Sequence, residues 1–305
     1  MAVVLIHTCP DGICQVWYRP FINFAVALFL FLSGYLTKTS YDNWNSFFKR
    51  RVTRVLIPYL IWTIIYSWAV LPDLKILVTN IITTNAAAHL YYLPVYIQFI
   101  ILTPLIVKLA NSRYRHLGWI ITPISLLTFY YPQYFAGKTL NGYLTMANDI
   151  SCLNWFTFYY LGIILGNKIL KPKFSLKTTG VLLTVSIILQ VFEGYALYKL
   201  GLNNCGTQLK LTSLLTSSLT CILVYALLLD HKIQTKNQLL LTIGEYSFGI
   251  YLSHILFNRL AKEFAFYAII PYVVNSVLIL ALSLFLCIVC DKVLSPRICR
   301  WLGIK

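Results

Sequence analysis

Long apolar runs, each close to the length that crosses a membrane, alternate with short polar segments along the whole chain. The runs are roughly 17–22 residues long, and a helix of that length crosses a hydrocarbon core of about 30 Å. An apolar stub from Met1 to Cys9 precedes them and is too short to span alone. We therefore predict membrane-spanning helices over residues 21–37, 55–71, 90–108, 117–131, 153–167, 178–197, 211–229, 239–258 and 272–291.

The overall composition supports lipid rather than water as the main solvent. Of the 305 residues, 59% are apolar and 11% are charged. A soluble domain typically has about 45–50% apolar and about 25% charged residues. Because there is too little polar surface to cover a soluble core, we predict one all-α membrane domain over residues 1–305. It would be a polytopic bundle of about ten transmembrane helices, with the first helix cut short.

The positive charge is distributed unevenly between the two sets of loops. The net charge is +16, with 25 Lys and Arg residues, and a nucleic-acid partner is one explanation of such a balance. However, only seven of these residues fall in one set of alternate loops, and basic residues collect in cytoplasmic loops. We therefore predict a bilayer partner and no nucleic acid, with residues 38–54 and the C-terminus in the cytoplasm and Thr8–Arg19 outside. The seven residues are Arg19, Lys75, Lys138, Lys199, Lys210, Arg259 and Lys262.

The longest of the predicted outer loops runs from Tyr131 to Asn154 and is rich in Tyr, Asn, Gly and Thr. It fits either a lid that faces a carbohydrate or an ordinary surface loop.

Three histidines fall near the outer ends of predicted helices. His7 ends the apolar stub, His89 begins the third span, and His254 lies in the outer third of the eighth. Imidazole titrates near neutral pH, which suits a general base. Each histidine alone would equally fit a helix cap or a membrane-interface residue, so the case for a site depends on the three meeting in space.

A basic cluster precedes the second span, with Lys49 and Arg51 beside Arg50 and Arg54, which are four residues apart on one helical face. We predict that Ser40 or Asp42 caps this helix. Arginine binds phosphate through paired hydrogen bonds, so the cluster could hold a phosphorylated ligand. The alternative is an anchor that pairs with anionic lipid headgroups.

A third group of polar residues lies within the eighth span, between Gly244 and His254. Ser247, Tyr251 and His254 bring hydrogen-bonding groups into the membrane, where polar side chains often mark functional sites. Small and polar residues also let helices pack closely, so a packing seam fits the same pattern.

Four segments of the chain together resemble the acyltransferase 3 family of bacterial membrane acyltransferases. The HLYYLP form of the third resembles the branch of the enterobacterial common antigen O-acetyltransferase. The segments occur in the family's order and are Val3–Thr8, Phe29–Leu36 followed by Phe48–Tyr59, His89–Pro94, and Gly244–His254.

The resemblance implies an enzyme that carries an acyl group from cytoplasmic acyl-CoA to a hydroxyl of an extracytoplasmic surface polysaccharide or glycolipid. The family's essential histidine matches His7, and its acyl-CoA-binding motif matches the basic cluster. We accordingly expect an O-acetyltransferase of the bacterial cytoplasmic (inner) membrane that uses acetyl-CoA as co-substrate and no metal. The residues expected to position the acceptor are His89, Tyr92, Ser247, Tyr251 and His254.

One departure from the family pattern concerns the first helix. In the family a full helix with an upstream arginine precedes the histidine, whereas here six residues precede His7 and none is arginine. Activity would be in doubt if the chain truly began at Met1. Two other functions fit the sequence: a transporter or exporter of glycan or lipid-linked intermediates, and a non-catalytic organiser of a glycan assembly complex.

Overall fold

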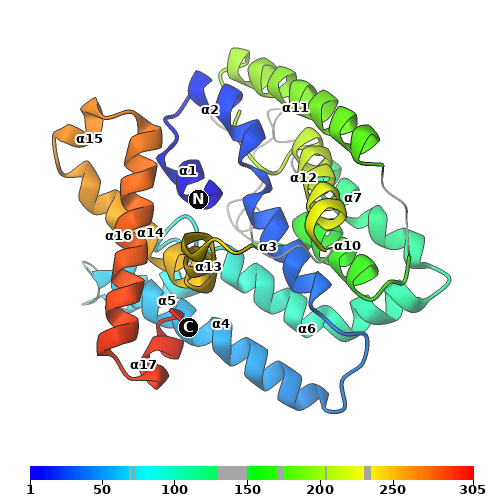
Figure 1. The fold of residues 1–305 in the computed structure, drawn as a ribbon, viewed down its shortest axis with the longest axis horizontal. Coiled ribbons are helices and arrows are strands. Elements are labelled where there is room, and N and C mark those ends of the chain that lie inside the picture. Colours follow the sequence, from blue (N-terminus) through cyan, green and yellow to red (C-terminus); the bar gives the residue numbers. More distant parts are fainter. Residues whose placement is uncertain (69–70, 72, 130–149, 171–174, 203–204, 230–234) are drawn as a thin grey trace. The chain divides into compact units, whose positions relative to one another are not determined.

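The computed structural model describes residues 1–305 except 69–70, 72, 130–149, 171–174, 203–204 and 230–234. Every regular element in the described part is a helix, which confirms the predicted all-α class (Figure 1). The predicted outer loop Tyr131–Asn154 falls mostly outside the described residues.

The described residues form two compact units. The first comprises Met1–Thr8, Asn43–Ile100 and Thr235–Lys305, and the second comprises Cys9–Asp42 and Ile101–Gln234. The first contains α1 (Ala2–Thr8), α4 (Trp44–Tyr66), α5 (Leu74–Thr83), α13 (Gln238–Glu245), α14 (Ser247–Lys262), α15 (Phe266–Ile269), α16 (Tyr272–Val293) and α17 (Pro296–Trp301). The second contains α2 (Ile13–Tyr18), α3 (Phe24–Tyr35), α7 (Ile121–Phe129), α10 (Phe156–Gly166), α11 (Leu176–Lys199) and α12 (Leu211–Val224), while α6 (Tyr92–Asn111) belongs to both.

Several helices are long and apolar enough to cross a membrane, as expected of a multi-pass membrane protein. In the described residues there are five, or six if a bent pair counts as one span. They match five of the nine predicted positions and cover Ile13–Tyr35, Tyr92–Asn111, Leu176–Lys199, Leu211–Leu228 and Tyr272–Val293.

The other four predicted spans take different forms. The second lies in α4, a 23-residue helix that begins at Trp44 and includes the basic cluster in its first half. The fourth and fifth coincide with short helices, α7 with 9 residues and α10 with 11. The eighth, predicted as one helix over 239–258, is bent by 77° between α13 and α14.

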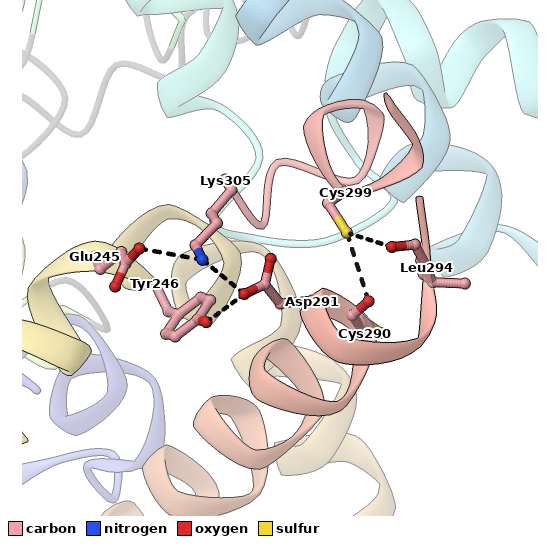
Figure 2. A network of polar contacts seen from close by, with 7 residues as sticks. All are labelled: Glu245, Tyr246, Cys290, Asp291, Leu294, Cys299 and Lys305. Atoms are coloured by element: carbon pink, nitrogen blue, oxygen red, sulfur yellow. Dashed lines mark hydrogen bonds and ion pairs between the residues drawn. The ribbon is translucent and has the colours of Figure 1, made fainter. Parts of the chain in front are cut away.

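The bend lies at Tyr246, where contacts to α16 and the last residue of the chain hold it (Figure 2). The Tyr246 hydroxyl donates to Asp291 at 2.7 Å. The Lys305 ammonium lies 2.6 Å from Asp291 and 3.2 Å from Glu245, so it joins the end of α13 to α16. These partners lie up to 60 residues away from the bend in sequence, and they fix the direction in which α14 leaves it.

In the second unit, α3 and α10 pack backbone against backbone through glycines. A Cβ placed at Gly162 would lie 2.1 Å from the Phe31 carbonyl oxygen and 2.6 Å from the Tyr35 nitrogen. One turn later, a Cβ at Gly166 would lie 2.1 Å from the Tyr35 carbonyl oxygen. Small residues allow this close approach between membrane helices.

We therefore expect Gly162→Ala to destabilise the protein by about 1–3 kcal/mol, the usual cost of overpacking. Thermal unfolding in detergent would measure the loss. Gly180→Ala in α11 is the matched control, because a Cβ at Gly180 meets nothing within 4 Å. Equal melting temperatures for the two variants would contradict the close packing of α3 and α10.

Candidate functional site

Three histidines from distant parts of the sequence meet within the first unit. His7 lies in the last turn of α1, His89 in the turn before α6, and His254 in the middle of α14. The ring centroids of His7 and His254 are 5.2 Å apart, those of His89 and His254 5.0 Å, and those of His7 and His89 6.3 Å. The structure thus brings together the three imidazoles that the sequence placed only near one membrane level.

His7 is held in place through its backbone. The Asn258 side-chain amide donates to the His7 carbonyl at 3.0 Å, and its own oxygen accepts from the Tyr267 hydroxyl at 2.8 Å. The neighbouring Thr8 hydroxyl lies 2.5 Å from that of Ser276 on α16. These contacts leave the His7 ring partly exposed.

The other two imidazoles are sealed from solvent. His254 is 0% exposed and His89 is 1% exposed. The Nδ1 atom of His254 lies 2.7 Å from the Tyr251 carbonyl oxygen, which can only accept, so Nδ1 carries the proton and Nε2 keeps its lone pair. The buried Nε2 atom has no hydrogen-bond partner among the described residues.

Burial lowers the pKa of His89 well below its usual value, and His254 and His7 lower it further. Both effects disfavour the charged form of a buried imidazole. His89 is therefore neutral at physiological pH, where it can accept a hydrogen bond without adding charge to the cluster.

Aromatic rings surround the buried side of the cluster. The Tyr251 ring lies 5.2 Å from His89 and 5.6 Å from Tyr92, and the Tyr251 hydroxyl donates to the His89 carbonyl oxygen. Tyr251 has one hydroxyl hydrogen, so this bond fixes the turn around His89 and leaves none for a substrate. Ser247 is the first residue of α14 and lies about 10 Å along the helix from His254, at 1.5 Å per residue.

The basic cluster lies on the first half of α4. The helix is capped by Asn43, whose side chain accepts from the Ser46 backbone at 3.1 Å, and the predicted caps Ser40 and Asp42 both precede it. Asn43, the residue after Asp42, belongs to the same class of short polar side chains that are preferred at the N-cap of a helix.

The side chains of the cluster remain available to a ligand. Lys49, Arg50 and Arg54 are exposed, and the two ion pairs found among the described residues both belong to Lys305. Arg51 is half-buried, with its guanidinium carbon 4.9 Å from the centre of the Phe47 ring. Because no acidic side chain in the described part of the chain pairs with Lys49, Arg50 or Arg54, these exposed cations form a site suited to phosphate.

We also searched the described residues for groups of side chains that could bind a metal ion. In the part of the chain that the structure describes, no three His, Cys, Asp or Glu residues are placed to hold a metal ion. The expectation that the reaction uses no metal stays a prediction.

Several residues of the site are not indicated by any pattern in the sequence. Asn258 and Ser276 hold α1 through partners 251 and 268 residues away. Tyr66, whose ring lies 5.4 Å from that of His89, looks like one of many aromatic residues in an apolar run. Asn258 alone offered a clue, because it lies one turn after His254 and so shares its helical face.

A helical membrane protein with a histidine cluster and a patch of basic side chains fits a membrane-bound transferase. The comparison with protein families identifies it further: the acyltransferase 3 model, described as an acyltransferase domain, matches residues 1–292. The chain therefore belongs to the acyltransferase 3 family and is a membrane acyltransferase. The comparisons with curated proteins and with solved structures found no match.

Proposed function

We propose that the protein moves an acetyl group from cytoplasmic acetyl-CoA to a hydroxyl of a surface polysaccharide or glycolipid. It would do so across the bacterial cytoplasmic (inner) membrane, with its C-terminus in the cytoplasm. The observation that carries the proposal is a partly exposed imidazole, His7, anchored through its backbone and packed against two buried ones. Such an imidazole can receive a proton from an acceptor that approaches from one side only.

The distance between the basic cluster and the histidines favours an acyl donor whose phosphates and reactive group are far apart. At 1.5 Å per residue, the axis of α4 rises about 24 Å from Arg50 to Tyr66, whose ring contacts His89. Phosphates held at Lys49, Arg50, Arg51 and Arg54 would therefore lie far from the imidazoles. Acyl-CoA fits this separation because its thioester is carried at the end of the pantetheine arm.

In the reaction, His7 removes the proton from the acceptor hydroxyl as the oxygen attacks the thioester carbonyl. The carbon–sulfur bond breaks, an ester forms on the acceptor, and the leaving thiolate takes the proton from the His7 imidazolium. General-base catalysis of this kind contributes about 10²–10⁴-fold. His254, whose ring centroid lies 5.2 Å from that of His7, holds the His7 ring from its buried side, and His89 remains neutral behind them.

Purified protein in detergent, with labelled acetyl-CoA and a membrane glycan fraction, tests the proposal. We expect the label to appear in an ester that mild alkali releases from the glycan. Absence of covalent transfer, with the protein folded by thermal unfolding, would exclude the enzyme.

A transporter or exporter is the second candidate, and the 77° bend between α13 and α14 favours it. Transporters often place a broken helix beside their substrate. In liposomes, vectorial movement of unmodified glycan would select this function over the enzyme. The family match to an acyltransferase domain argues against it.

A further inference from the structure

The phenol of Tyr66, at the end of α4, bridges two backbone groups of α14. Its hydroxyl donates to the Leu252 carbonyl at 2.6 Å and accepts from the Leu256 amide at 3.1 Å. In an α-helix, residues 252 and 256 are the pair that normally bond to each other. The hydroxyl therefore holds this turn of α14 against the end of α4.

The bridged turn is the one that carries His254. The hydroxyl therefore acts on the backbone directly beneath that imidazole, whose Nδ1 is bonded to Tyr251 in the same turn. Tyr66 is 7% exposed, so water has little access to compete for either bond.

The ring of Tyr66 reaches the second buried histidine. It meets the His89 ring edge-on, with centroids 5.4 Å apart and an interplanar angle of 83°. The guanidinium carbon of Arg259 also lies 5.2 Å from the Tyr66 centroid. Arg259 also donates to the Ala86 carbonyl at 2.7 Å, which ties the turn before His89 to α14.

We infer that Tyr66 is a positioning residue that sets the orientation of His254 through the backbone of α14 and that of His89 through ring contact. The inference rests on the proposed acetyl transfer and assigns Tyr66 no contact with the reacting atoms. A tyrosine that only filled space would need its ring but not its hydroxyl, so the two roles make different predictions for Tyr66→Phe.

In Tyr66→Phe the ring contacts stay while the bridge is lost. The turn of α14 beneath His254 is then no longer held to the end of α4, so His254 can shift from its position. Because small misplacements of reacting groups cost up to about 10²-fold, we expect kcat for acetyl transfer to fall about 10- to 100-fold. KM for acetyl-CoA should stay within about twofold, because the basic cluster lies about 24 Å away along α4.

Tyr59→Phe provides a matched control on the same helix. Tyr59 is 3% exposed, and its hydroxyl donates to the Ile81 carbonyl in α5, away from the histidines. Each variant removes one tyrosine hydroxyl, which makes two hydrogen bonds at Tyr66 and one at Tyr59, so a comparable loss of melting temperature is expected. Only Tyr66→Phe should lower kcat.

A readout independent of activity is the modification of histidines by diethyl pyrocarbonate, followed by mass spectrometry. We expect His89 and His254 to react faster in Tyr66→Phe than in the wild type or Tyr59→Phe, because the cluster is no longer fixed. An unchanged kcat in Tyr66→Phe, or an equal fall in both variants, would overturn the inference while leaving the enzyme in place. If the wild type transferred no label, the proposed function would fall, and equal modification rates in the three proteins would then reject the positioning role as well.

Discussion

Replacing His7 by alanine is expected to lower the rate of acetyl transfer by about 10²–10⁴-fold, the contribution of a general base. The contacts that hold α1 should survive, because Asn258 donates to the backbone carbonyl of residue 7 and not to its ring. The loss should therefore appear in kcat with little change in the melting temperature. Label from acetyl-CoA in the glycan fraction measures the rate.

His116→Ala is the control for this variant, since it removes an exposed imidazole of the second unit. It should keep wild-type turnover. Turnover near the wild-type value in His7→Ala would reject His7 as the base. His254 would then be the next candidate, because its ring lies 5.2 Å from that of His7 and its buried Nε2 atom has no hydrogen-bond partner among the described residues.

The sequence predicted the parts of the site that depend on local pattern. Apolar run length predicted nine spans, and five of them coincide with described helices that could cross a membrane, because the cost of leaving backbone groups unpaired in lipid makes a long apolar run helical. The family motifs added the identities of His7 and the basic cluster. Neither source gave distances, so the meeting of His7, His89 and His254 became visible only in the folded unit.

The residues that hold the site escaped prediction for a physical reason. The bend at Tyr246 falls inside a run that reads as one apolar helix, and its partners Asp291 and Lys305 lie 45 or more residues away. The bond from Asn258 to His7 and the bridge from Tyr66 to α14 are also long-range contacts. Helical periodicity describes which face a residue occupies, but it does not say which helix packs against that face.

Under the proposed acetyl transfer, we expect the two ends of α4 to have different tasks. Its first half presents cations to the surface, and its last turn contacts both His89 and α14. Variants in the first half of α4 should therefore change the affinity for the acyl donor. Variants in its last turn should change the rate at which the bound donor reacts. A single assay that separates KM from kcat distinguishes the two ends.

Replacing Arg50, Arg51 and Arg54 together by glutamine is expected to raise KM for acetyl-CoA roughly 10- to 100-fold. Exposed charge pairs contribute about 0.2–1 kcal/mol each, so three of them contribute up to about 3 kcal/mol, and 1.4 kcal/mol corresponds to tenfold in affinity. Exposed phosphate contacts are also screened by salt, so the wild-type KM should rise with ionic strength more steeply than that of the variant.

Acetyl-pantetheine, a donor without phosphates, makes this test specific. The triple variant and the wild type should use it equally well, because the lost guanidinium groups have nothing to bind on it. Arg297→Gln with Arg300→Gln, which removes exposed cations near the C-terminus, is the control for general charge and should leave KM for acetyl-CoA unchanged. If the triple variant instead bound acetyl-CoA normally but inserted poorly into membranes rich in anionic lipid, the cluster would be a headgroup anchor and the phosphate site would have to be sought elsewhere.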